Sequence, residues 1–288
     1  MPVLRARHLL ALLLTLACPA VAADTAAIPI WSKAPPGSER RAGEAEQLEA
    51  GAYVHNVHRP SVTVSRPDAR RANGAAIIIV PGGGHRMLVF QNEGMAPARA
   101  LNRYGITTFV LKYRLAREAG SSYTIEGDAV ADARRAIRWV RAHAKEYGVD
   151  PHRVGIMGFS AGGELVSLLA DNPQPDAAAA ADAIDRQSAR PDFQILVYPG
   201  PLGIPARSVA GAPSAFIAAG SLDRCCATPA LTLYTQLREA GVPAELHMFA
   251  STDHGFNVAV HNDRVSIQHW PDRLADWLSD EGWLTPGH

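Results

Sequence analysis

Short apolar runs alternate with amphipathic stretches along the chain from residue 75 onward. The runs occupy residues 75–80, 106–111, 153–158, 193–198, 214–219 and 244–249. The first of them reads AAIIIV, with an apolar residue at every position. Such continuous runs are typical of strands that are buried on both faces of a parallel sheet. We therefore predict six strands.

Helical patterns fill the gaps between these runs. Within residues 128–147, apolar residues recur at Ala129 and at 4, 7, 8, 11 and 15 positions beyond it, which is one face of a helix. Gly148 predicts its end. Further helices are predicted over residues 93–104, 161–171, 229–240 and 265–279. Strands that alternate with helices predict an α/β fold with a mostly parallel central sheet and helices on both faces.

The remaining segments are less regular. A strand is expected around residues 63–65, and the alanine-rich stretch 171–192 is interpreted as a loop with a short helix. No long insertion separates the strands predicted at 193–198 and 214–219, so we expect little or no cap over the site. No stretch has the composition of a linker, and residues 23–288 are therefore interpreted as a single domain.

The amino terminus has the pattern of a secretory signal peptide over residues 1–22. Two arginines precede an apolar run over residues 9–17, and the small residues AVA end at Ala22. The run is too short to span a bilayer. Cys18 offers a lipoprotein signal as the alternative, but Pro19 follows it directly. We predict cleavage near Ala22 and a secreted or periplasmic protein, and the sequence leaves these two locations open.

Charge and cysteine content limit the binding partners and metals that we expect for this chain. Lysine and arginine total 28 and acidic residues total 28, and no block of like charge occurs, so neither nucleic acid nor a membrane is expected as a partner. Cys225 and Cys226 are adjacent and leave two possibilities open, a vicinal disulfide or buried thiols. No histidine or further cysteine lies at metal spacing from them, so they form a poor zinc site. We expect no metal and no cofactor.

The stretch GFSAG over residues 158–162 places one serine among very small residues. It directly follows a predicted strand and precedes a predicted helix, which is the context of a nucleophile elbow. In such a sharp turn the residues two before and two after the serine must be small, because the helix and the strand approach closely. Ser160 is therefore the candidate nucleophile.

A serine nucleophile needs a general base and an acid that orients that base. On this kind of sheet both follow the serine in the chain, the acid first. Asp223 comes just after the fifth predicted strand and His254 just after the sixth. Asp253 competes with Asp223, but neighbours in sequence rarely orient their side chains toward each other in this way. The competing histidines lie in a strand or toward the last helix: His247, His261 and His269.

A further element of acyl-transfer chemistry is a pair of backbone N–H groups that bind the oxyanion of the tetrahedral intermediate. The segment PGGGH, residues 81–85, follows the first predicted strand and has the glycines that allow such N–H groups to face a substrate. Ala161, directly after the serine, supplies another N–H group. A phosphate loop is disfavoured, because neither G-K-[ST] nor G-x-G-x-x-G is present.

With these motifs the chain resembles the α/β-hydrolase superfamily, and within it small secreted bacterial esterases related to acetyl xylan and feruloyl esterases. The resemblance covers residues 28–280. It is carried by IPIW (28–31), NVHRPSVTV (56–64), VPGGGH (80–85), EGMA (93–96), FVLKYRL (109–115), GFSAGGEL (158–165), SARPDFQILVYP (188–199), ELHMF (245–249) and DHGF (253–256).

The resemblance implies specific roles. Ser160, Asp223 and His254 would form the triad, and Gly83, Gly84 and Ala161 would be the oxyanion donors. Three departures lie near the pocket. His85 replaces an aromatic residue and Glu164 replaces a histidine, and both are candidate substrate contacts, with a solvated loop position as the alternative for His85. Arg224, Cys225 and Cys226 replace a hydrophobic continuation after Asp223.

The sequence thus predicts a secreted serine esterase for short acyl groups. Acylated carbohydrate, such as acetylated or feruloylated xylan, is the expected substrate, or a small ester. A general carboxylesterase or a peptidase on the same scaffold is an alternative, as is a catalytically silent carbohydrate-binding protein. The oligomeric state stays open.

Overall fold

The computed structural model describes residues 27–172, 182–260 and 262–284. The expected signal peptide with its cleavage site near Ala22, and His261, lie outside the described residues. Eight strands form one sheet in the order β1-β4-β6-β5-β7-β8-β9-β10. All six predicted strands are confirmed: β5 (Ala76–Val80), β6 (Thr107–Lys112), β7 (Val154–Phe159), β8 (Phe193–Val197), β9 (Ser214–Gly220) and β10 (Ala244–Phe249).

These six strands run parallel and lie side by side. Two further strands, β4 (Ser61–Ser65) and β1 (Ile28–Pro29), extend the β6 edge antiparallel to their neighbours. A separate hairpin of β2 (Gln47–Glu49) and β3 (Tyr53–His55) was not predicted, because its strands have only three residues each. Val54 of this hairpin forms a bridge to Leu88, close to the glycine-rich segment.

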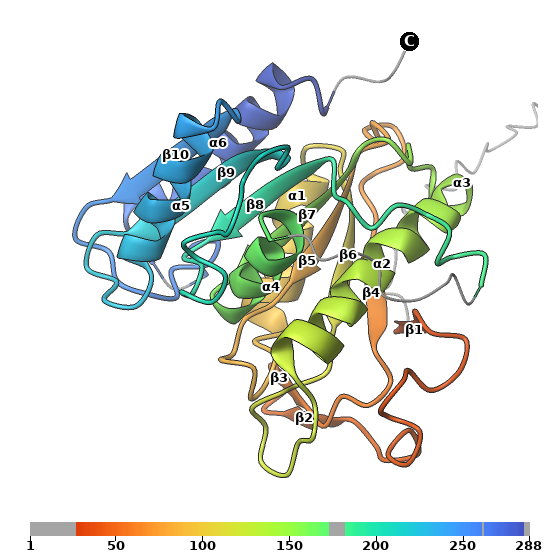
Figure 1. Cartoon of the computed structure of the whole chain (residues 1–288). Coiled ribbons are helices and arrows are strands. Elements are labelled where there is room, and N and C mark those ends of the chain that lie inside the picture. Colours follow the sequence, from red (N-terminus) through yellow and green to blue (C-terminus); the bar gives the residue numbers. More distant parts are fainter. Residues whose placement is uncertain (1–26, 173–181, 261, 285–288) are drawn as a thin grey trace, which may run out of the picture.

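The helices cover both faces of the sheet, as predicted. The chain moves from β5 to β6 in one direction and from β6 to β7 in the other, so right-handed crossovers place the two connecting helices on opposite faces. Accordingly, α2 (Val130–Ala142) and α4 (Ala161–Ala170) lie together on one face, with α1 (Ala96–Asn102) on the other (Figure 1). The remaining helices are α5 (Ala227–Glu239) and α6 (Val265–Asp280).

Two predicted helices are interrupted in the structure. The helix predicted over residues 128–147 is divided into η2 (Ile125–Ala129), α2 and α3 (Ala144–Tyr147). The break between α2 and α3 lies at His143, whose backbone leaves the helical conformation with φ −106° and ψ 12°. Gly148 ends the segment with φ 66°, as predicted. The helix predicted over residues 93–104 begins as a wide turn, η1 (Gln91–Met95), before α1.

The connection between β8 and β9 contains no helix or strand, so this segment places no helical cap over the carboxyl edge of the sheet. The alanine-rich stretch expected to hold a short helix lies partly outside the described residues. None of the helices in the described ranges has the length and apolarity needed to cross a membrane.

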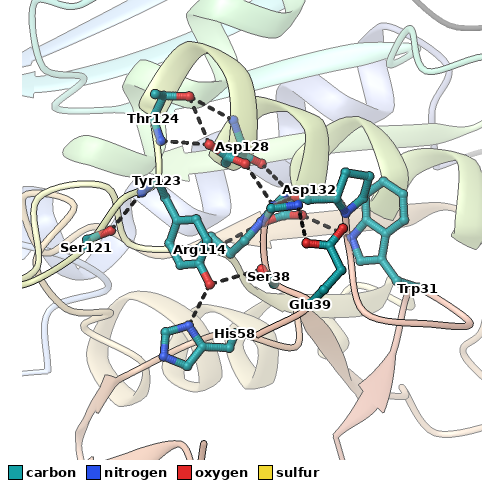
Figure 2. Close-up of polar contacts among 12 residues, drawn as sticks. Trp31, Ser38, Glu39, His58, Arg114, Ser121, Tyr123, Thr124, Asp128 and Asp132 are labelled. Atoms are coloured by element: carbon teal, nitrogen blue, oxygen red, sulfur yellow. Dashed lines mark hydrogen bonds and ion pairs between the residues drawn. The ribbon is translucent and has the colours of Figure 1, made fainter. Parts of the chain in front are cut away.

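The amino-terminal segment is held by hydrogen bonds to a buried ion pair, from Trp31 to Asp132 and from Arg114 to the carbonyl oxygen of Pro36. The guanidinium of Arg114 donates to both carboxylate oxygens of Asp132 at 2.8 and 2.9 Å, and also to Asp128 at 2.8 Å. Figure 2 shows Arg114 between these two acids, with the indole N–H of Trp31 also bonded to Asp132. Beside them, the hydroxyl of Ser38 donates to the Tyr123 oxygen at 3.0 Å. These contacts join the irregular first segment to the start of α2.

Candidate active site

Ser160 stands at the turn between β7 and α4, at the carboxyl edge of the sheet. Its backbone has φ 51° and ψ −117°, a strained conformation for a residue with a side chain. A Cβ atom added to Gly158 would lie 2.3 Å from the carbonyl oxygen of Gly162, and one added to Gly162 would lie 2.0 Å from that of Val80. The small residues around the serine therefore allow the close approach of strand and helix that the sequence pattern predicts.

His254 joins Ser160 to Asp223. Its Nε2 lies 2.9 Å from the Oγ of Ser160, and its Nδ1 lies 2.7 Å from the Oδ2 of Asp223. Because an ionised carboxylate can only accept, Nδ1 carries the proton and Nε2 is left to accept from the serine hydroxyl. The three residues come from the ends of β7, β9 and β10, so the parallel sheet brings together side chains up to 94 positions apart.

The carboxyl of Asp223 is buried and well anchored. Its Oδ1 accepts the backbone N–H groups of Cys225 and Cys226, both at 3.1 Å, at the start of α5. The two cysteines are joined by a disulfide, one of the two possibilities that the sequence leaves open. Asp253 instead accepts the backbone N–H of His254 at 2.7 Å. Its carboxylate is therefore used locally and is not paired with the imidazole ring.

The other candidate histidines lie elsewhere. His247, within β10, is 2.6 Å from Glu245, and its ring stacks on Phe216. His269 is on α6 and lies 3.0 Å from Asp272. Within the described residues, neither histidine forms a hydrogen bond or an ion pair with Ser160 or Asp223.

The glycine-rich segment and the start of α4 carry backbone N–H groups beside Ser160. Gly83 and Gly84 have φ 122° and 64°, which turn the backbone in ways that favour glycine. Ala161 is the first residue of α4, where backbone N–H groups have no partner within the helix. Within the described residues, the N–H groups of Gly83, Gly84 and Ala161 donate to no protein atom. They are thus available to an oxygen atom of a ligand.

His85 and Glu164 form a buried pair. His85 is fully buried and Glu164 is 5% exposed, and the Nε2 of His85 lies 2.8 Å from the Oε2 of Glu164. The alternative of a solvated loop position for His85 is therefore wrong. The other oxygen of Glu164 accepts the N–H of Leu202 at 3.2 Å. Both side chains connect the glycine-rich segment to α4 and lie beneath the protein surface.

Sequence reasoning missed another buried acid beneath the site, Glu93. Glu93 accepts the N–H of Gly82 at 2.8 Å and the hydroxyl of Tyr198 at 3.0 Å. Burial raises the pKa of the Glu93 carboxyl. The ring of Tyr198 lies against that of His254, with centroids 4.8 Å apart, and its oxygen accepts the N–H of Asn257 at 3.2 Å. One chain of contacts thus links the glycine-rich segment to the loop of His254.

A polar cavity of about 400 Å³ opens beside His254. Most of its lining comes from the loop after β10. The polar residues that line it are Asn92, Ser251, Thr252, Asp253, His254, Asn257, Asn262 and Arg264. The cavity therefore offers hydrogen-bond donors and acceptors to a group that lies next to the imidazole.

Proteins of known name are similar to parts of this chain. The BD-FAE family model matches residues 63–195, a range that includes Ser160 and ends before Asp223 and His254. Acetylxylan esterase of Xylanibacter ruminicola is 32% identical over 216 residues, which are 64% of this chain and 41% of that protein. Ethyl acetate hydrolase of Pseudomonas putida is 28% identical over 144 residues, 49% of this chain and 41% of that protein. The chain thus spans about two fifths of the length of these relatives.

Solved structures match over more of the chain. The acetyl ester-xyloside bifunctional hydrolase of Caldicellulosiruptor lactoaceticus has 26% identity and a TM-score of 0.70, with 90% of this chain and 97% of that chain covered. An esterase of Thermogutta terrifontis, at 24% identity and a TM-score of 0.67, covers 88% of this chain and 96% of its own, and shows the shared fold. The chain therefore has the α/β-hydrolase fold, is similar to the BD-FAE family over residues 63–195, and is similar to bacterial carboxylic ester hydrolases and acetylxylan esterases.

Proposed function

We propose that this chain hydrolyses carboxylic esters with Ser160 as nucleophile, His254 as general base and Asp223 as the acid that orients the base. The observation that carries the proposal is the position of the imidazole, 2.9 Å from the serine oxygen and 2.7 Å from the carboxylate. A nucleophile, a base and an orienting acid in hydrogen-bond contact are the arrangement that activates a serine. The similarity to ester hydrolases supports the ester as the bond that is hydrolysed.

In the first half-reaction, His254 Nε2 takes the hydroxyl proton as Ser160 Oγ attacks the acyl carbon. Asp223 holds the ring in the required tautomer and stabilises the imidazolium that forms. The carbonyl oxygen becomes an oxyanion in the tetrahedral intermediate. The N–H groups of Gly83, Gly84 and Ala161 are proposed to bind it, and each such donor is typically worth about 3 kcal/mol in the transition state.

Collapse of the intermediate releases the alcohol. His254 gives its proton to the leaving oxygen, and the acyl group stays on Ser160 as an ester. A water molecule then enters beside the imidazole and loses a proton to Nε2 as its oxygen attacks the acyl carbon. The second intermediate returns the proton to Ser160 Oγ and frees the carboxylic acid.

The proposed substrate is a short-chain acyl ester of a carbohydrate, with acetylated or feruloylated xylan as the leading class. Because His254 must protonate the leaving oxygen, the alcohol part lies on the side of the imidazole. The cavity on that side is lined by amide, carboxylate and guanidinium groups, which suit the hydroxyls of a sugar. The connection between β8 and β9 adds no helical cap to this edge, which leaves room for a polymer. Two relatives are named for acetylated or xylose-containing substrates.

A general carboxylesterase for small esters is the second candidate. The similarity to ethyl acetate hydrolase favours it. It differs from the leading proposal only in the alcohol that is accepted, and it requires the same three residues.

The test compares the mature chain with Ser160→Ala on p-nitrophenyl acetate, butyrate and octanoate, methyl ferulate and acetylated xylan. We expect hydrolysis of acetate in preference to octanoate, acetate release from xylan, and loss of nearly all activity in the variant. Activity on small esters without release from xylan would favour the second candidate. Equal activity of the variant, or none above it with the intact chain, would contradict the proposal.

We also propose that the chain is exported, because residues 1–22 have the signal-peptide pattern. Amino-terminal sequencing of the exported protein tests this, and a mature chain that begins near residue 23 is expected. A chain that retains its first residues inside the cell would contradict it.

A further inference from the structure

Cys225 and Cys226 lie next to two residues of the proposed triad. From the sequence alone the pair is a poor zinc site, because no histidine or further cysteine is near them in the chain. The fold changes this, because the loop after β10 brings His254 beside the first turn of α5. Ligand atoms of Asp223, Cys225, Cys226 and His254 all lie within 4.8 Å of one another.

The composition of this cluster suits a thiophilic cation. Zinc prefers four ligands from cysteine, histidine and carboxylate, with bonds of about 2.0–2.3 Å. In a tetrahedron with such bonds the ligand atoms are about 3.3–3.8 Å apart. The widest separation here exceeds that by about 1 Å. After reduction the two sulfur atoms, which are bonded to each other in the disulfide, must move apart to this spacing, while the widest gap must close. Side-chain movement allows both, because the side chains of Cys225 and His254 are exposed, whereas Asp223 and Cys226 are buried and form the fixed half.

The disulfide determines whether the two sulfur atoms are available to bind a metal. A metal binds thiolate sulfur, and the two sulfur atoms are bonded to each other in the structure. We propose that reduction of Cys225–Cys226 creates a Zn²⁺ site from both thiolates, the imidazole of His254 and the carboxylate of Asp223, and that the bound metal stops hydrolysis. The inhibition, though not the metal binding, rests on the proposed function.

A phosphine can reduce the disulfide to two thiols. The phosphine gives two electrons to the disulfide, water supplies two protons to the sulfurs, and its oxygen leaves in phosphine oxide. Zn²⁺ then displaces the two thiol protons as it binds. A metal on the imidazole replaces the contact between His254 and Asp223, so the ring no longer serves as the base for Ser160.

The test is a calorimetric titration, in which ZnCl₂ is added to the phosphine-reduced chain under anaerobic conditions. The absorption of Co²⁺ bound to thiolate is read in parallel. We expect one ion per chain for the reduced protein, and none for the oxidised protein. The double variant Cys225→Ser with Cys226→Ser keeps the backbone N–H groups that hold Asp223. It is expected to lose more affinity than the about 10–100-fold that loss of a second-shell partner costs.

Hydrolysis of p-nitrophenyl acetate is measured on the same samples. Zinc is expected to inhibit the reduced chain and to leave the double variant and the oxidised chain active. Absence of binding to the reduced chain, or equal binding to the double variant, would overturn the site. Cysteine-dependent binding without inhibition would overturn the contact with His254. If no sample hydrolyses the ester, the proposed function fails, while the titration still decides the metal site.

Discussion

Asp171 offers a quantitative test of how burial acts on a charge in this fold. It is fully buried at the end of α4, the helix that starts beside Ser160. Its Oδ1 accepts from the side-chain amide of Gln194 at 2.7 Å, and its Oδ2 has no partner within the described residues. Burial raises the pKa of this carboxyl from 3.8 to about 7. The acid is therefore protonated in the folded chain at pH values where it is ionised in the unfolded chain.

The sign of the effect follows from proton binding. Between about pH 4 and about pH 7 the folded state binds more protons at this site than the unfolded state, so the free energy of unfolding falls as the pH rises. Below that window Asp171 is neutral in both states, so its titration does not lower the free energy of unfolding. At about 1.4 kcal/mol for each pKa unit, the full loss above the window is about 4 kcal/mol.

Asp171→Asn removes the titration. The amide leaves a buried N–H group without an acceptor, which costs about 1–3 kcal/mol at every pH. The informative quantity is therefore the change with pH and not the stability at one pH. We expect the variant to gain stability relative to the parent chain by up to about 4 kcal/mol between about pH 4 and about pH 8.5.

Urea unfolding at both pH values measures this difference. The exposed Asp263→Asn change is the control, and it is expected to follow the parent chain at both pH values. If Asp171→Asn and the parent chain lose stability in parallel as the pH rises, the raised pKa of Asp171 is wrong.

Three further outcomes are expected. Asp223→Asn lowers kcat on p-nitrophenyl acetate by about 10³–10⁴-fold, because the amide favours the wrong imidazole tautomer, and a change under tenfold would contradict its role. Glu93→Ala lowers the urea-derived stability by about 1–3 kcal/mol for each donor left unpaired, on Gly82 and Tyr198, whereas retained stability would refute their dependence on it. Gly82→Ala places a Cβ 2.6 Å from the Phe159 carbonyl oxygen, so thermal unfolding is expected at lower temperature; an unchanged Tm would show that the turn adapts.

The hydrophobic pattern was sufficient to predict the six parallel strands of the sheet. The six parallel strands are rich in apolar residues, and each is buried along nearly its whole length except β10, which lies at the edge. The order of Ser160, Asp223 and His254 after successive strands was readable for the same reason, because parallel strands end at one edge. The very short strands β1, β2 and β3 have too few residues to show a period.

Contacts between distant residues account for what was missed. His85 and Glu164 are 79 positions apart, and Glu93 and Tyr198 are 105 apart, so neither pairing leaves a local pattern. From sequence alone, an acidic residue inside a predicted helix is interpreted as exposed to solvent. Glu93 is buried only because η1 packs under the glycine-rich segment. One usable signal was that Glu93 belongs to the stretch EGMA that carries the resemblance.

The most direct test of the central claim is covalent capture of the nucleophile. The intact chain and Ser160→Ala are treated with paraoxon, and peptide mass spectrometry locates the diethylphosphoryl group while esterase activity is followed. We predict a single label on Ser160, loss of activity in proportion to labelling, and no label in the variant. A label on another residue with loss of activity, or full activity in a chain labelled at Ser160, would contradict the account.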